Sequence, residues 1–428
     1  MQNLSKKRIL DAINHRQPDR IPFDLGSTGV TGMHIKAVEA LRQHYGLEQK
    51  PIKLYEPYQC LGLIEDDLAQ CLGTDVVSPK MPQNWFGIEN KNWKSWRTPW
   101  GQDVLIPHDF NLTYGDDGTI FAYAQGDTSF PPSGKMPASG YFFDAVMRQD
   151  PLPDDDDDLK LEDNTEEFTL FTEDTLKTIE SSVKTAHASG NGVIAAFGGS
   201  GLGDIAMIPA MHMKKPKGIR DITEWYMSTV LREDLLHSIF AYQIDIAIEN
   251  LSRINALCGS DIDVIFTCGT DFGTQTSTFC SIDTFRSLYA PYYTRLNTWI
   301  HANTNWKIFK HSCGSVPAFI PDFIKCGFDI LNPVQCSATG MDPRWLKKEF
   351  GSDLVFWGGG VDTQNTLPFG TPQEVRAEVL ERCEIFGKDG GFVFNAIHNV
   401  QSTTPVENMV AMIDAVHEFN GEKVRHKS

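Results

Sequence analysis

The sequence has little positive charge. Its 38 lysines and arginines are outnumbered by 56 aspartates and glutamates, so the formal net charge of the 428-residue chain is −18. Nucleic acids and anionic lipids are bound through basic surfaces, and this balance argues against both kinds of partner. No apolar run approaches the roughly 20 residues of a membrane span. Residues 1–8 are charged with no apolar stretch behind them, which predicts that they are not a signal peptide.

Cysteine is also sparse. The chain has nine, an odd number, spread from Cys60 to Cys383 without the dense framework of a disulfide-rich protein. This pattern favours reduced thiols and a cytoplasmic protein. No G-x-G-x-x-G motif follows the first expected strand, which argues against a doubly wound dinucleotide-binding sheet. Hydrophobic residues make up 41% of the chain, enough to form a sizeable core.

The chain does contain a regular alternation of short apolar segments and longer helical ones after Phe168. This alternation is typical of a parallel sheet built from βα units. With a strand near Ile21 and one more expected in the irregular N-terminal half, it predicts an α/β fold, a (β/α)8 TIM barrel, with a doubly wound sheet as the alternative. The expected strands of the second half are 192–198, 263–267, 306–310, 329–332, 354–357 and 391–395, and the expected helices are 172–189, 221–231, 233–257, 282–303, 318–326, 343–350, 372–386 and 405–419.

The N-terminal half is less regular. From about residue 75 to 150, prolines and glycines separate short aromatic segments, and a hairpin is expected around Asp116–Tyr123. We interpret this region as a β-containing insertion or lid. Residues 151–167 include five consecutive aspartates and are expected to be a solvated acidic linker. The whole chain, 1–428, is therefore predicted to be one barrel domain.

Polar side chains recur at the expected strand ends, and one group stands out. His311 and Cys313 are two residues apart, so an extended backbone points both to the same face. His398 follows the last expected strand, and the strand ends of a barrel meet at one mouth. Imidazole and thiolate select zinc, and three protein ligands with an open fourth position are the catalytic arrangement. The alternative is a hydrogen-bonded histidine beside an ordinary buried cysteine.

Other strand ends supply further candidates. Asp271 is a candidate general base or fourth metal ligand, or alternatively a helix or turn cap. His398 is a second candidate for proton transfer. Asp362 follows three glycines and is expected either to bind substrate or to stabilise a turn. The complete set of predicted substrate-binding residues is Gln275, Gln335, Asp362 and Asn395.

Several ordered motifs resemble one known family. They are His311-Ser312-Cys313-Gly314, the segments 330–335 and 358–364, and Thr404-Pro405-Val406-Glu407-Asn408, with a weaker match at 19–22. Together they are similar to the uroporphyrinogen decarboxylase superfamily. The closer similarity is to its methyltransferase branch, whose enzymes move a methyl group between a corrinoid protein and a thiol or other acceptor. The resemblance implies a (β/α)8 barrel.

The resemblance also implies a ligand set, with one departure. Methyltransferases of this branch bind zinc through His-x-Cys and a distant cysteine, and that distant position falls on His398 here. In the decarboxylases a histidine at the corresponding place contacts substrate, so both roles are open for His398. Decarboxylases that act on uroporphyrinogen carry an arginine-rich R-Q-A-G-R-Y motif that binds propionates. The segment 16–22 of this chain lacks it, which argues against that reaction.

We therefore expect a zinc-dependent methyltransferase with a small-molecule methyl donor or acceptor. The chain has no D-x-H-x-x-G corrinoid-binding motif, so the corrinoid (cobalamin) is expected on a partner protein. Related barrels often dimerise, and a homodimer is left open. One alternative is a metal-independent decarboxylase or other lyase in which His398 and Asp271 move protons. A third is a non-catalytic protein that binds a corrinoid or another tetrapyrrole.

Overall fold

The centre of the molecule is a parallel sheet of seven strands. The computed structural model describes residues 4–153 and 156–422. The strand order is β15-β14-β13-β12-β11-β10-β3, so strands that follow one another after β10 are neighbours in space. The bounds are β3 (Val76–Val77), β10 (Gly192–Ala195), β11 (Val264–Cys268), β12 (Lys307–His311), β13 (Ile330–Asn332), β14 (Val355–Trp357) and β15 (Phe392–Val393).

One short segment joins the two edges of this sheet. Phe23 forms a parallel bridge with Phe394, directly after β15, and the amide of Asp24 donates to the Phe394 carbonyl at 2.9 Å. On the other side, the amide of Asp75 donates to the Phe23 carbonyl at 2.7 Å, and Asp75 directly precedes β3. The sheet therefore curls round as in a TIM-like barrel. The strand expected near Ile21 is this bridge, and β3 is the additional strand expected in the N-terminal half.

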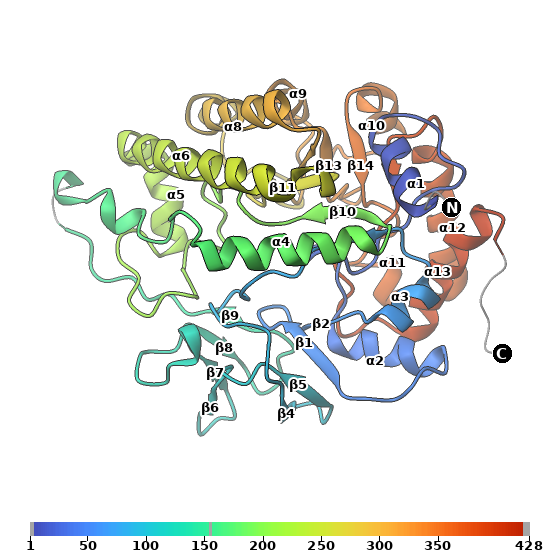
Figure 1. Cartoon of the computed structure of the whole chain (residues 1–428), viewed down its shortest axis with the longest axis horizontal. Coiled ribbons are helices and arrows are strands. Elements are labelled where there is room, and N and C mark those ends of the chain that lie inside the picture. Colours follow the sequence, from blue (N-terminus) through green and yellow to red (C-terminus); the bar gives the residue numbers. More distant parts are fainter. Residues whose placement is uncertain (1–3, 154–155, 423–428) are drawn as a thin grey trace.

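Helices cover the outside of the curled sheet (Figure 1). Every helix expected after Phe168 is present, with ends shifted by at most a few residues. The expected helix 282–303 is interrupted by a π-helical turn at Phe285–Tyr289, because Pro291 has no amide proton for the regular helical ladder. The helices are α4 (Glu173–Ala188), α5 (Ile222–Leu231), α6 (Glu233–Cys258), α7 (Ile282–Thr284), α8 (Ala290–Asn303), α9 (Ile320–Lys325), α10 (Pro343–Phe350), α11 (Thr366–Phe369), α12 (Pro372–Phe386) and α13 (Val406–Phe419).

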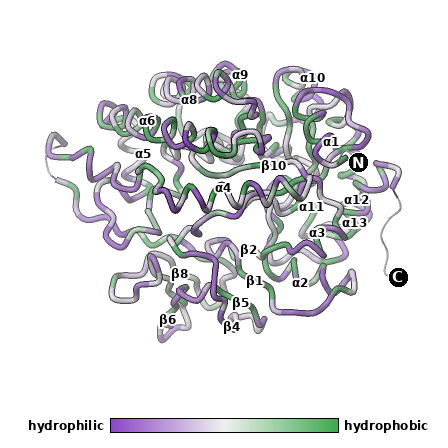
Figure 2. Tube along the Cα trace, in the orientation of Figure 1, coloured by the Kyte–Doolittle hydropathy of each residue, from purple (hydrophilic) through white to green (hydrophobic). Residues whose placement is uncertain are grey.

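The packing of these helices follows from their sequence pattern. Helix α4 buries Leu176, Ile179, Val183 and Ala186, whose spacing of three and four residues places them on one face. Figure 2 shows the same helix alternating between hydrophilic and hydrophobic positions. Strand β10 is buried at all four residues, as expected for a parallel strand covered by helices. In the described part of the chain, no helix is long and apolar enough to cross a membrane.

The N-terminal half contributes three further α-helices and two smaller four-stranded sheets, and the sheets lie below the barrel in Figure 1. The expected hairpin is confirmed, because β6 and β7 pair antiparallel. The bounds predicted for the N-terminal insertion, 75–150, differ from those of the smaller sheets: the segment includes barrel strand β3, and the sheets begin earlier, at Ile52. The role of this segment as an insertion or lid stays a prediction. Asp154 and Asp155 of the acidic linker lie outside the described residues. The first two helices are α1 (Leu4–Ile13) and α2 (Ile35–His44), a third is α3 (Asp66–Leu72), and the strands are β1 (Ile52–Glu56), β2 (Leu61–Gly62), β4 (Lys94–Arg97), β5 (Asp103–Ile106), β6 (Leu112–Tyr114), β7 (Ile120–Ala122), β8 (Gly134–Met136) and β9 (Asp144–Ala145).

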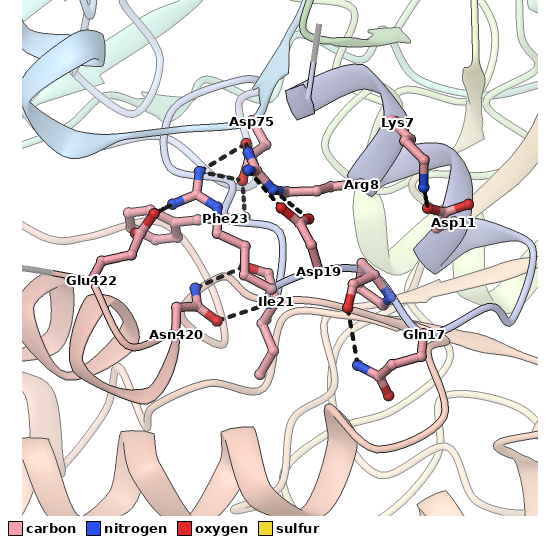
Figure 3. A network of polar contacts seen from close by, with 12 residues as sticks. Lys7, Arg8, Asp11, Gln17, Asp19, Ile21, Phe23, Asp75, Asn420 and Glu422 are labelled. Atoms are coloured by element: carbon pink, nitrogen blue, oxygen red, sulfur yellow. Dashed lines mark hydrogen bonds and ion pairs between the residues drawn. The ribbon is translucent and has the colours of Figure 1, made fainter. Parts of the chain in front are cut away.

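A polar network holds the amino-terminal end of the barrel together (Figure 3). The buried carboxylate of Asp75 pairs with Arg8 and Arg20, each at 3.1 Å, and accepts the amide of Phe23 at 3.1 Å. Arg20 also pairs with Glu422, beyond the end of α13. Because Arg20 and Asp75 directly precede the barrel segments, these charges lie opposite the mouth formed by the carboxyl ends of the strands.

Glu56 at the end of β1 makes stability depend on pH. Its buried carboxylate accepts the amides of Tyr58 and Gln59, both at 2.8 Å, yet burial raises its pKa to about 7. The carboxyl of an unfolded chain has a pKa of roughly 4.3. Between these values the folded protein holds a proton that the unfolded chain has lost. The free energy of unfolding therefore falls as pH rises through this window.

We expect Glu56→Gln to remove this pH dependence. Relative to the variant, the original protein should lose about 3 kcal/mol between pH 5 and pH 8, from a pKa difference of more than two units at about 1.4 kcal/mol per unit. Urea unfolding of both proteins at the two pH values measures the effect. A difference between the proteins that stays constant across this range would contradict the assignment.

Candidate metal centre

Three side chains converge at the mouth of the barrel. His311 ends β12, Cys313 follows it by two residues, and His398 comes from the segment after β15. One ligand atom from each lies within 4.8 Å of the other two. The Nε2 of His311 is 3.3 Å from the Sγ of Cys313, and the rings of His311 and His398 lie 5.6 Å apart at an angle of 69°. The structure therefore brings the three predicted ligands together.

The protonation states of the two histidines and the cysteine suit a bound cation that displaces the thiol proton. Burial lowers the pKa of His311 to about 4 and lowers the pKa of His398, so both imidazoles are neutral at pH 7. Burial, with the nearby charge of Asp271, raises the pKa of Cys313 well above its usual value. Without a cation Cys313 is therefore a thiol. A bound cation would stabilise the thiolate and release the proton.

The donor set fits zinc. In a tetrahedral site with bonds of about 2.0–2.3 Å, neighbouring ligand atoms are roughly 3.3–3.8 Å apart. The separation of 3.3 Å between Nε2 and Sγ is already in that range. Two imidazoles and one thiolate suit zinc better than magnesium or calcium, which prefer oxygen ligands. Within residues 4–153 and 156–422 this is the one group of three such side chains close enough to hold a metal.

Asp271 lies directly beside this cluster. Its Oδ1 accepts the amide of Cys313 at 2.6 Å and is 3.8 Å from Nε2 of His311. The side chain is 27% exposed, so the carboxylate contacts both the cluster and solvent. This position agrees with the turn-capping alternative, and the role of Asp271 as a general base or metal ligand stays a prediction.

Gln275 and Gln335 support the loop that carries the thiol. The Oε1 of Gln335 accepts the amide of Gly314 at 2.7 Å, and its Nε2 donates to Oε1 of Gln275 at 2.7 Å. Gln275 in turn donates to the carbonyl of Ser337 at 2.8 Å. Both glutamines are thus bound to the protein itself next to the cluster. Their role in binding substrate stays a prediction.

The other two predicted substrate-binding residues have different surroundings. The carboxylate of Asp362 accepts the amides of Gln364 at 2.7 Å and Asn365 at 3.2 Å, the pattern of a residue that stabilises a turn. The Nδ2 of Asn395 donates to the carbonyl of Asp24 at 2.8 Å, while its buried Oδ1 has no partner in the described structure. Of these two, Asn395 has the free hydrogen-bonding group.

Sequence reasoning assigned no role to three buried polar residues that end or follow barrel segments. Asn332 ends β13, and its Oδ1 lies 2.7 Å from Nδ1 of His311. Burial raises the pKa of Asp204, after the glycine-rich loop that follows β10, to about 6, and the charge of Asp271 adds to this shift. Burial raises the pKa of Asp24 to about 6 as well. Each follows or ends a barrel strand, which is the one signal that could have identified it.

A family model described as Uroporphyrinogen decarboxylase (URO-D) matches residues 162–419, more than half of the chain. The uroporphyrinogen decarboxylase of Psychromonas ingrahamii is 34% identical over 90 residues, covering 20% of this chain and 24% of that protein. That of Bordetella petrii is 32% identical over 123 residues, covering 26% and 33%. The chain thus aligns with about a quarter to a third of the length of these relatives.

A solved structure matches almost the whole chain. A methyltransferase from Methanosarcina mazei aligns with 97% of this chain and 98% of its own length, with a TM-score of 0.53 and 17% sequence identity. At this identity the likeness establishes a shared fold and leaves the chemistry to be argued from the site. The match extends over most of residues 1–161, which the family model does not reach.

Proposed function

The chain belongs to the uroporphyrinogen decarboxylase family, and on this premise we propose that it is a zinc-dependent methyltransferase acting with a corrinoid protein on a separate chain. The observation that carries the proposal is the convergence of His311, Cys313 and His398 at the barrel mouth. A methyltransferase also shares the fold over nearly its full length. The second partner is a small molecule that donates or accepts the methyl group.

Three residues of the chain would hold the zinc ion and leave a position for substrate. Bound zinc would lower the pKa of a thiol or polarise a methoxy group, so that the methyl group can be transferred. His311 and His398 need no proton change to act as ligands, since both are neutral at pH 7. Cys313 must give up its thiol proton, and metal binding should therefore weaken as pH falls.

We assign proton handling to Asp271. Its carboxylate is held by the Cys313 amide at 2.6 Å and remains 27% exposed. A group in this position can accept the proton that an incoming thiol or hydroxyl releases, and pass it to solvent. His398 is the other proton-transfer candidate, and it can fill that role only where it is not a metal ligand.

Decarboxylation of a polycarboxylate, the activity named for the curated relatives, has less support. Such a substrate needs several cations at the mouth. Arg16 instead pairs with Asp11 at 3.1 Å, and Arg20 pairs with Asp75 at 3.1 Å and with Glu422. Both arginines therefore lie at the amino-terminal end of the barrel, opposite the mouth. A metal-independent decarboxylase or lyase remains the second candidate because of the relatives' names.

Metal content and turnover test the proposal together. We expect about one zinc per chain after purification in zinc-containing buffer, and methyl transfer between methylcobalamin and a small thiol, followed by the cobalamin absorbance. Removal of zinc with dipicolinate should abolish transfer, and added zinc should restore it. Metal-free protein with undiminished turnover, or one that releases carbon dioxide from a carboxylate substrate without metal, would overturn the proposal in favour of a lyase.

A further inference from the structure

The hydrogen bonds behind His311 define which of its nitrogens carries a proton. The Nδ2 of Asn332 donates to the carbonyl of Trp357 at 2.8 Å. A carbonyl oxygen cannot donate, so the other end of the amide, Oδ1, must be the atom that faces His311. Oδ1 can only accept, and it lies 2.7 Å from Nδ1. The neutral ring therefore carries its proton on Nδ1.

This tautomer aims the lone pair of His311 at the cluster. With Nδ1 protonated, Nε2 is unprotonated, and Nε2 is the nitrogen 3.3 Å from the Sγ of Cys313. The opposite tautomer would direct an N–H into the same space and block metal binding. Asn332 is fully buried, and strand pairing sets it directly beside His311 in register. The orientation of the Asn332 amide and the position of the strand that carries it are therefore both fixed.

We propose that Asn332 is a positioning residue that holds His311 in its metal-binding tautomer, with the Trp357 carbonyl fixing the orientation of the amide. The metal-binding role of this tautomer rests on the proposed zinc site. The tautomer itself follows from the hydrogen bonds and does not require a metal. Partners of this kind fix the ring orientation of metal-binding histidines in other proteins, where they are commonly carboxylates.

A neutral partner has a consequence for the charge of the site. A carboxylate in place of Asn332 would add negative charge behind His311 and make the imidazole a stronger donor. The amide fixes the ring without that charge. Cys313 then remains the single ligand that becomes negative on binding, and the cation keeps more of its ability to activate a substrate.

The first test reads the tautomer in metal-free protein. ¹⁵N-labelled histidine spectra distinguish the two neutral tautomers, and His311→Gln identifies the resonances of His311 by their loss. We expect the Nδ1–H form in the original protein and in Asn332→Asp, which keeps the acceptor oxygen. We expect a large fraction of the Nε2–H form in Asn332→Leu. An unchanged tautomer in Asn332→Leu would overturn the proposal, whatever the protein does with zinc.

The second test measures metal binding. Asn332→Leu should weaken zinc affinity about 10- to 100-fold in competition with a chromophoric chelator, and should alter the visible spectrum of the cobalt-substituted protein. Asn332→Asp should recover most of the affinity. Both variants lose the bond to Trp357, so their difference isolates the contact with His311. Equal affinity in the two variants would contradict the proposal.

A matched control separates positioning from general destabilisation. Asn297 is also fully buried and donates to a carbonyl, that of Cys326 at 3.0 Å, but lies on α8 outside the cluster. Asn297→Leu should lower stability to a similar degree and leave zinc affinity unchanged. If it weakens zinc binding as much as Asn332→Leu, the effect is structural and the inference fails. If no protein binds zinc while the tautomer result holds, the proposed function fails and the inference stands.

Discussion

Cys313→Ala should reduce the zinc content from about one per chain to near zero and lower methyl transfer by at least about 100-fold. The reason is that Cys313 is the ligand that becomes negative, and two neutral imidazoles bind zinc far more weakly than two imidazoles with a thiolate. Cys313 sits at the loop after β12, with its amide held by Asp271. Metal analysis and the cobalamin assay measure both effects.

A second cysteine provides the control. Cys383 is fully buried in α12, away from the barrel mouth, and Cys383→Ala removes a thiol that is more buried than that of Cys313. This variant should keep its zinc and its activity, with a modest loss of stability from the cavity that it leaves. Full zinc occupancy in Cys313→Ala, with Cys383→Ala unchanged, would show that the cluster is not the metal site.

Gly314→Ala should destabilise the protein by about 3 kcal/mol or more and displace the thiol from the cluster. Gly314 has φ +85°, a left-handed conformation that side chains disfavour. A Cβ there would stand 2.3 Å from the carbonyl oxygen of Gly273 and 2.5 Å from that of Thr274. Backbone atoms must move to admit it, and Cys313 is the adjacent residue. Thermal unfolding and zinc content measure the two consequences.

Gly46→Ala is the control for this prediction, because it has the unfavourable backbone conformation without the steric clash. Gly46 also has positive φ, +67°, but a Cβ there would meet nothing within 4 Å. It should cost only about 1 kcal/mol and leave zinc binding intact. Similar losses in the two variants would mean that the loop of Gly314 adapts to the added methyl group, against our expectation.

The regular half of the fold could be predicted because its signals are local. The strand from Val355 to Trp357 and helix α12 have the apolar pattern and boundary residues that define them in sequence, including the Thr371–Glu374 capping box. Strand β3 could not be located, because two residues carry no periodicity. The Phe23 bridge depends on partners more than 50 and 370 positions away, which no local pattern contains.

The candidate site was predictable to a similar extent. His311 and Cys313 were found because a two-residue spacing in an extended segment is a local geometric fact. His398 could be grouped with them only by assuming a barrel fold, and the structure shows how close its ligand atom lies to the other two. Asn332 was recognised as a residue at a strand end but given no role, because its importance arises from pairing in register with His311. Asp204 was missed because its raised pKa comes from burial, which the sequence of a glycine-rich loop does not reveal.

The contacts at the amino-terminal end of the barrel determine when the ring can close during synthesis of the chain. Arg20 meets Glu422, 402 positions later, and Phe23 meets Phe394, so the first segment of the ring has no second neighbour until the last part of the domain exists. During synthesis, a ribosome must release nearly all of these residues before the ring can close. Until then the Phe23 segment on one side of the sheet, and the most recently made strand on the other, are exposed edges that can pair wrongly. Chaperone demand should therefore peak late in translation.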